Sequence, residues 1–177
     1  MPVLVGLTVT LRPVTADDRP RLLEILATPE VSRWWDSPAH DTAWPMDEEA
    51  DTRFTILLEG KVVGLIQFGE ETDPMYRHAG IDLFLDPAAQ GRGLGQDSIR
   101  ALARYLFGER GHHRLVIDPA ADNHRAISSY AAVGFRPVGV MRAYERNADG
   151  TGWHDGLLMD LLVTDLGEAA PTPPAAG

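Results

Sequence analysis

The stretch that decides the fold is Ile81–Gly95, which reads IDLFLDPAAQGRGLG. Its first half alternates as a β-strand does, and we expect the strand to end at Asp86-Pro87. A loop with glycines at 91, 93 and 95 then opens directly into an amphipathic helix. Glycines let a ligand approach the backbone closely, and the free N–H groups and peptide dipoles of a helix N-terminus favour an anion. The segment therefore predicts a cradle for a pyrophosphate.

Two other phosphate-binding loops do not fit this segment. A P-loop requires Gly-Lys-[Ser/Thr], and the dinucleotide fingerprint requires G-x-G-x-x-G followed by a ribose-binding acid. The loop from Gly91 to Gly95 reads G-x-G-x-G instead. A tight strand–helix turn that needs glycine only for its backbone conformation is the alternative interpretation.

The segments on either side of the loop predict an α/β fold. The expected strands are Leu7–Pro13, Phe54–Leu58, Lys61–Phe68, Ala79–Asp86, Leu115–Asp118, Phe135–Val140 and Gly156–Val163. The expected helices are one that starts at Thr15 and ends by Thr28-Pro29, then Gly93–Phe107 and Asn123–Val133, with residues 30–50 irregular. This order indicates a mixed, largely antiparallel sheet with helices on both faces, and not a doubly wound parallel sheet.

The composition is that of one globular domain. The 177 residues are 44% hydrophobic and 24% charged, which suffices for a core without disulfides. We expect a single domain over residues 1–166 and a disordered tail over 167–177, where the chain is rich in Pro, Ala and Gly. No cysteine is present, which excludes disulfides and a cysteine nucleophile.

The charge and hydropathy patterns restrict the partners. The chain has 16 Lys+Arg against 26 Asp+Glu, a net charge of −10, which disfavours nucleic acid and favours cationic partners, although solubility alone also explains it. No apolar run reaches the ~18 residues of a membrane span, and the first dozen residues alternate as a strand does rather than forming a signal peptide. We expect a cytoplasmic protein that binds neither nucleic acid nor membranes, as a monomer or a homodimer.

Two motifs in this chain resemble hallmarks of the GNAT superfamily of N-acetyltransferases. The segment Gln90–Gly95 is similar to its Q/R-x-x-G-x-G/A motif, and Asn123–Phe135 is similar to N-x-x-A-x-x-x-Y-x-x-x-G-F. The likeness covers residues 7 to about 163. Within the superfamily the chain looks most like the aminoglycoside 6′-N-acetyltransferases, on Trp34-Trp35, 70–74, 80–82, 117–119 and 153–160. Segments 36–53 and 146–155 depart from the better-known members, which leaves the range of accepted drugs open.

The resemblance implies that acetyl-CoA binds where the strand Ala79–Asp86 splays from the strand Leu115–Asp118. The implied cofactor-binding residues are Leu83, Phe84, Leu85, Gln90, Gly91, Arg92, Gly93, Leu94, Gly95, Asn123 and Tyr130. Arg92 and the helix N-terminus would neutralise the phosphates, with Arg125 as a further candidate, while acids face the other mouth. We therefore expect a cleft with one basic and one acidic end.

Three residues are the candidates for catalysis. Asp82 is the first choice as general base for the amine and Asp118 the second. Asp82 lies on the expected strand Ala79–Asp86, on the face opposite Ile81, and Asp118 comes at the C-terminal end of the next strand. An aspartate with an ordinary pKa near ~4 is a weak base unless burial or like charges raise that value. Tyr130 resembles the family's general acid for the departing thiolate. The alternatives are a structural ion pair or cap for Asp82 and a core tyrosine for Tyr130.

Acidic and aromatic residues are the candidates for binding the acceptor, since aminoglycosides are polyamines. They are Trp35, Glu70, Glu71, Asp73, Asp82, Asp118 and Asp155. For 70–73 the alternative is a solvated loop, and for Trp35 a place in the core. The six histidines form no metal-binding pattern, so we expect no metal.

Two further functions share these motifs. One is acetylation of a protein N-terminus or of another small amine. The other is a non-catalytic acyl-CoA sensor, which would need neither Asp82 nor Tyr130.

Overall fold

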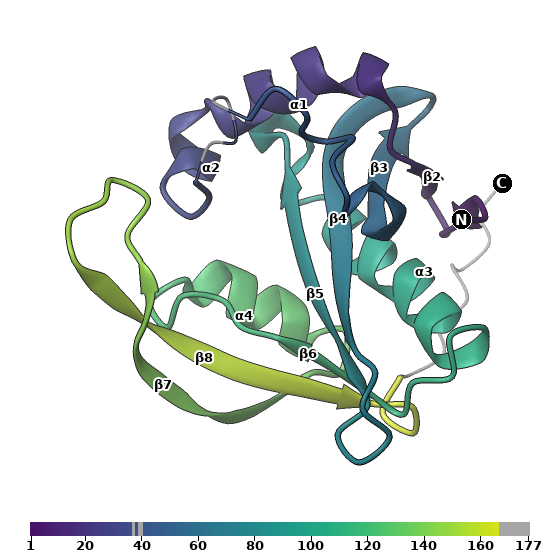
Figure 1. Cartoon of the computed structure of the whole chain (residues 1–177), viewed down its shortest axis with the longest axis vertical. Helices are drawn as coiled ribbons and strands as arrows, with labels where there is room; N and C mark the ends of the chain where they lie inside the picture. Colours follow the sequence, from purple (N-terminus) through teal and green to yellow (C-terminus); the bar gives the residue numbers. More distant parts are fainter. Residues whose placement is uncertain (37, 39–40, 167–177) are drawn as a thin grey trace, which may run out of the picture.

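The computed structural model describes residues 1–36, 38 and 41–166, so the tail expected over 167–177 lies outside the described residues. One open sheet runs in the order β1-β2-β3-β4-β5-β6-β8-β7 (Figure 1). Its strands are β1 Leu4–Val5, β2 Val9–Pro13, β3 Arg53–Leu58, β4 Lys61–Glu71, β5 His78–Leu85, β6 Arg114–Ile117, β7 Arg136–Arg146 and β8 Trp153–Leu162. The helices are α1 Arg19–Leu26, α2 Pro29–Ser32, α3 Leu94–Gly108 and α4 His124–Ala131, with single 3₁₀ turns at Ala16–Asp18, Ala50–Thr52 and Pro87–Ala89.

The predicted mixed sheet is confirmed. Each pair of neighbouring strands is antiparallel except β5 and β6, which are parallel. The hairpin at Glu59-Gly60 and the helix after the glycine loop form as expected. The capping box expected from Thr15 and Asp18 also forms, and it begins the 3₁₀ turn Ala16–Asp18 that leads into α1 at Arg19.

Three boundaries differ from the expectation. The strand expected at Leu7–Pro13 begins at Val9 as β2, and a separate short strand, β1, precedes it. The chain is divided here because the Asp97 carboxylate accepts hydrogen bonds from the backbone N–H groups of Leu7, Thr8 and Val9. The segment expected to be irregular contains the short helix α2, which begins at Pro29. Strands β7 and β8 extend beyond Val140 and before Gly156, so the last hairpin is longer than predicted.

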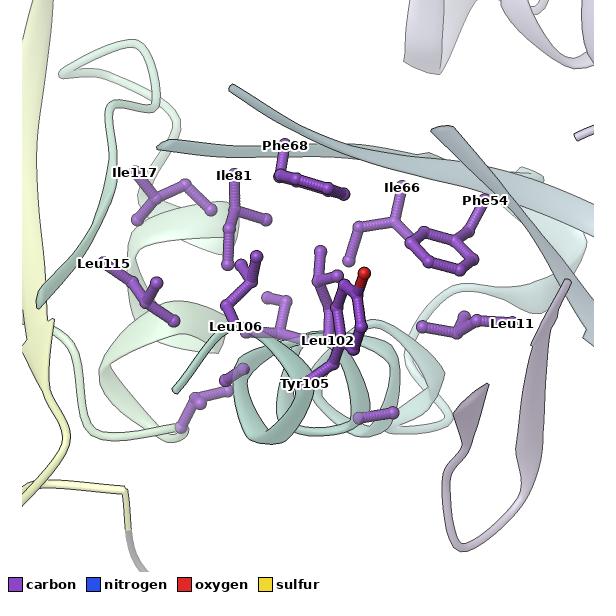
Figure 2. Close-up of a cluster of buried hydrophobic side chains, with 14 of the residues drawn as sticks. Leu11, Phe54, Ile66, Phe68, Ile81, Leu102, Tyr105, Leu106, Leu115 and Ile117 are labelled. Atoms are coloured by element: carbon purple, nitrogen blue, oxygen red, sulfur yellow. The ribbon is translucent and has the colours of Figure 1, made fainter. Parts of the chain in front are cut away.

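Two apolar clusters lie on opposite faces of the sheet. Figure 2 shows the larger one, where Leu102, Tyr105 and Leu106 of α3 pack beneath Phe54, Ile66, Phe68 and Ile81 of the strands. The smaller one joins Leu22, Ile25 and Leu26 of α1 to Leu65 and Phe84. Neighbours on one strand thus face different layers, as β-alternation requires. Both faces are covered by helices, and burial of the side chains fixes the orientation of β4 and β5.

The parallel pair β5–β6 is short, and this positions the functional site. Only Ala79 pairs with Leu115 and Gly80 with Val116. Beyond Gly80, β5 continues beside β4 while β6 continues beside β8. The sheet therefore opens toward the C-terminal ends of β5 and β6, and the predicted splayed strand pair is confirmed.

Candidate active site

A cleft of about 1390 Å³ occupies the place where β5 and β6 separate. Its walls come from the end of β5, the start of α3, helix α4, the segment 30–36 and the β7–β8 hairpin. Pockets for a single small ligand are typically about 300–1,000 Å³. The cleft therefore has room for two ligands bound side by side.

One end of the cleft is an anion cradle built by the glycine loop. Gly91 and Gly93 have φ of +75° and +77°, a conformation in which residues with a Cβ are rare, and no atom lies within 4 Å of a Cβ built at either position. Gly93 is the N-cap of α3, so the first N–H groups of this helix face the loop without intrahelical partners. The loop therefore fits the phosphates of a nucleotide-like ligand.

The residues expected to bind the cofactor differ in their positions. Gln90 lines the cleft, and its Nε2 donates a 2.9 Å hydrogen bond to the carbonyl of Leu85, which holds the loop against β5. Arg92 is exposed and is absent from the residues described as lining the cleft, whereas Arg125 of α4 lines it. Asn123 also lines it, and its Oδ1 accepts from the N–H of Ala126 as the cap of α4.

The edge of β5 forms the wall next to the cradle. Leu83, Phe84 and Leu85 line the cleft. Among the described residues, no strand pairs with this part of β5 on the side of β6. The Leu85 carbonyl accepts from Gln90, and the remaining backbone groups on that side can bind an extended ligand, as a neighbouring strand would.

Asp82 and Asp118 line the same cleft and lie close enough for their charges to interact. Water reaches Asp82 through the open cleft, but the surrounding walls hold most of the solvent away from its carboxylate. This desolvation, and then the negative charges of Asp118 and Glu145, raise the pKa of Asp82 to about 6, against a smaller opposing effect of a hydrogen bond from Gln67. Asp82 is therefore a stronger base than an ordinary aspartate.

Tyr130 is the third candidate catalytic residue in the cleft. It lies on α4, packs against the main core and lines the cleft. Burial raises the pKa of its hydroxyl, and the negative charges of Asp82 and Asp118 raise it further. Tyr130 consequently keeps its proton at neutral pH and can donate it as a hydrogen bond.

The last hairpin adds cleft residues that the sequence analysis missed. Tyr144 and Glu145 of β7 and His154 of β8 line the cleft beside Asp118. A hydrogen bond from Tyr144 to Asp118 raises the pKa of Tyr144 to about 12. His154 Nε2 lies 3.4 Å from the Glu145 carboxylate. The sequence pattern of β7 did not predict that these residues line the cleft. They reach it only where β7 departs from regular pairing with β8.

Three of the expected acceptor residues, Glu70, Glu71 and Asp73, are not among the described residues that line the cleft. Glu70 comes near the end of β4, where Arg110 holds it in an ion pair and His112 Nε2 lies 2.7 Å from its carboxylate. Glu71, the last residue of β4, is exposed, and so is Asp73 in the loop that joins β4 to β5. This loop lies at the bottom of Figure 1, whereas β5 reaches the cleft at its other end. Strand β5 has eight residues and therefore spans roughly 25 Å, which separates this loop from the end of β5 at the cleft.

The other two expected acceptor residues take different positions. Trp35 lines the cleft and also packs edge to face on Phe84, with ring centroids 5.0 Å apart, so it belongs both to the cleft wall and to the smaller apolar cluster. Asp155 is exposed and is absent from the described lining. Its Oδ1 accepts a 2.7 Å hydrogen bond from the N–H of Ala143.

The described part of the chain shows neither a candidate metal centre nor a membrane-spanning helix. The residues that the structure describes contain no group of three or more His, Asp or Glu side chains that could hold a metal ion. None of the described helices is long and apolar enough to cross a membrane.

The comparisons with known proteins agree with this geometry. A family model for the acetyltransferase (GNAT) domain matches residues 8–136, so the chain belongs to the GNAT acetyltransferase family. It is 33% identical over 156 residues to aminoglycoside N(6′)-acetyltransferase type 1 of Klebsiella pneumoniae, covering 76% of this chain and 77% of that protein. Spermidine N(1)-acetyltransferase of Escherichia coli K12 is 22% identical over 140 residues, covering 75% of each chain.

One solved structure with a similar fold contains two ligands, Parmomycin and acetyl-CoA. The crystallised AAC(6′)-Ib, in complex with Parmomycin and acetyl-CoA, superposes with a TM-score of 0.72 and 26% identity. The match covers 89% of this chain and 95% of that one.

Proposed function

We propose that this protein transfers the acetyl group of acetyl-CoA to a primary amine of a cationic small molecule, with the 6′-amine of an aminoglycoside as the first choice. The observation that carries the proposal is the placing of Asp82, Asp118 and Tyr130 in one cleft with an anion cradle at its other end. The relatedness to an aminoglycoside acetyltransferase supports the choice of acceptor.

The glycine loop and the edge of β5 fit coenzyme A. Gly91, Gly93 and the first N–H groups of α3 would hold the pyrophosphate, and Arg125 would add positive charge nearby. The backbone of Leu83–Leu85 would pair with the extended arm. When bound, acetyl-CoA supplies an acetyl group on a thioester, which the amine attacks directly while the thiolate leaves.

Asp82 prepares the amine for attack. An ammonium must lose a proton before its nitrogen lone pair is available, and a carboxylate with a pKa of about 6 accepts that proton more readily than one with a pKa near ~4. The negative charge of Asp118 contributes to this basicity and also attracts the ammonium. Asp82 therefore acts as the base, directly or through a water molecule.

Tyr130 serves the leaving group. Its raised pKa keeps the hydroxyl protonated, so it donates a hydrogen bond or a proton to the departing thiolate.

A cytoplasmic location fits the proposal, because a chain without cysteine forms no disulfides and needs no oxidising compartment.

A linear polyamine is the second candidate acceptor. The carboxylates of Asp82, Asp118 and Glu145 in one cleft would suit several ammonium groups in a row, and the relatedness to a spermidine acetyltransferase favours this class. A protein N-terminus carries one ammonium and uses fewer of these carboxylates.

The test is release of thiol from acetyl-CoA, followed with a colorimetric thiol reagent. The acceptors are kanamycin, a relative without the 6′-amine, spermidine and a short peptide with a free N-terminus. Because the chain has no cysteine, the protein gives no background colour. We expect turnover with kanamycin and none with the relative lacking the 6′-amine.

The other outcomes assign the alternatives. Turnover with spermidine alone would make the protein a polyamine acetyltransferase, and turnover with the peptide alone would indicate a protein substrate. Acetyl-CoA that raises the melting temperature without turnover of any amine would favour the sensor and contradict the proposal.

A further inference from the structure

The β7 strand has a bulge beside the cleft. Met141 pairs with Gly156 and Glu145 pairs with His154, so three residues of β7 lie opposite the single residue Asp155. Ala143, in the middle of the bulge, has φ of +47°, a conformation that residues other than glycine rarely adopt. The surrounding structure must therefore hold this backbone in place.

Asp155 provides the contact that holds it. Its Oδ1 accepts the N–H of Ala143 at 2.7 Å, and its own carbonyl accepts the N–H of Ala121 at 2.8 Å. One residue of β8 thus connects the bulge to the loop that follows Asp118. The same loop is also fixed by Leu157, whose N–H donates to the carbonyl of Pro119 at 2.8 Å.

The bulge directs Tyr144 toward the acceptor end of the cleft. The ring of Tyr144 lies over Gly156, where a Cβ would come within 2.9 Å of its Cδ1. Gly156 therefore makes room for the ring. From this position Tyr144 lines the cleft together with Asp118, and the interaction of its hydroxyl with that carboxylate is the main cause that raises the pKa of Tyr144.

We infer that Asp155 is a positioning residue for acetyl transfer: it holds the bulge of β7 so that Tyr144 orients the carboxylate of Asp118 toward the acceptor amine. This rests on the proposed function, in which Asp118 faces the amine. Asp155 itself stays outside the cleft lining and acts through Tyr144. An acidic residue expected to bind the acceptor by charge thus acts by accepting a backbone hydrogen bond.

A set of matched variants separates these two roles. Asp155→Asn keeps an oxygen that can accept the N–H of Ala143 but removes the charge, whereas Asp155→Ala removes both. If Asp155 is a positioning residue, Asp155→Asn retains most of the kcat with kanamycin, and Asp155→Ala lowers it about 10- to 100-fold, the loss expected for one hydrogen bond to a charged group. Asp149→Ala removes another acid of the same hairpin and serves as the control, with kcat unchanged.

The path through Tyr144 has its own test. Tyr144→Phe removes the hydroxyl that donates to Asp118 and should lower kcat by a similar factor. The kcat of the double variant Asp155→Ala/Tyr144→Phe should fall no further than that of the more impaired single variant. The reason is that both changes abolish the same contact, the one between Tyr144 and Asp118. Losses that multiply would overturn the inference. So would an Asp155→Asn variant whose KM for kanamycin rises as much as that of Asp155→Ala, since this outcome means direct binding by charge.

A measurement independent of turnover keeps this inference separate from the proposed function. Hydrogen exchange should show the amide of Ala143 protected in the wild type and in Asp155→Asn, and unprotected in Asp155→Ala. Equal protection in all three variants would refute the role of Asp155 even in an active enzyme. Wild-type protein that turns over no amine would refute the proposed function, while the exchange pattern would still report on the bulge.

Discussion

Glu70 and Asp82 lie on neighbouring strands of the same sheet and have opposite electrostatic environments. Glu70 is held by Arg110 and His112, and the hydrogen bond from Arg110 is the main cause that lowers the pKa of its carboxyl. Asp82 faces the cleft, and among the described residues no cation pairs with it. Loss of solvent and the charge of Asp118 raise its pKa to about 6.

The difference between these two acids shows that the surroundings of a carboxylate determine its role. A carboxylate that is neutralised by a cation of its own chain stabilises the fold. One that lies among like charges in a cleft can bind a cation or accept a proton from a ligand. The sequence alone makes both acids equally plausible ligands for an amine. Their partners in space distinguish them.

The largest expected effect contrasts the two acids directly. Asp82→Asn should lower kcat by about 10²–10⁴-fold, since it removes the base that accepts the proton of the amine. Glu70→Gln should leave kcat within about twofold, because its carboxylate is at the other end of β5. Steady-state kinetics with acetyl-CoA and kanamycin measures both. A large loss of kcat in Glu70→Gln would refute the distinction.

The second effect concerns the leaving group. Tyr130→Phe should lower kcat by about 10- to 100-fold with little change in the KM for the amine, because the hydroxyl donates only as the thiolate departs. Tyr76→Phe, an exposed tyrosine in the β4–β5 loop, is the matched control. An unchanged kcat in Tyr130→Phe would end its assignment as the acid.

The pH dependence of the reaction tests the pKa of Asp82. Because the base works only when ionised, kcat should fall about tenfold for each pH unit below about 6 and become level above it. The profile of Asp82→Asn should lack this step. A step near ~4 in the wild type would mean that the cleft leaves the basicity of Asp82 unchanged.

A smaller effect appears in stability, where the two acids act with opposite sign. The folded protein lowers the pKa of Glu70 from 4.5, so this group stabilises the fold above that pH and loses its contribution as the pH falls. It raises the pKa of Asp82 from 3.8 to about 6, so ionisation of Asp82 disfavours the fold as the pH rises through this window.

At pH 7, Glu70→Gln should therefore lower the free energy of unfolding by about 1 kcal/mol, which lowers Tm by a few degrees, and Asp82→Asn should not lower Tm. Near pH 3 both differences should shrink. Thermal unfolding of the wild type and both variants at pH 7 and pH 3 measures these differences in Tm.

The smallest effect is the response to salt. Added salt should raise the KM for kanamycin a few-fold, because exposed charges are screened over a Debye length of ~8 Å at physiological ionic strength. The KM of a monoamine should rise less, since it engages fewer carboxylates. A KM for kanamycin that stays constant with salt would contradict an acidic acceptor site.

Much of the fold was predictable because its signals are local. The glycine loop, the helix after it and the hairpin at Glu59-Gly60 each follow from a few consecutive residues. Strand alternation likewise indicated that Ile81 and Phe84 face different layers, as they do. The division of the first strand was not predictable, because it depends on Asp97, almost ninety residues further along the chain.

From the sequence alone, two motifs of fixed spacing identified the family, and Asp82, Asp118 and Tyr130 could be named as candidates. Only the tertiary structure decided which acids share the cleft: it brought Glu145 in beside them, bound Glu70 to Arg110 and tied Asp155 to the bulge of β7. The physical reason is that the role of a carboxylate depends on the charges and donors within a few ångströms of it. Those neighbours come from distant parts of the chain, which only folding brings together.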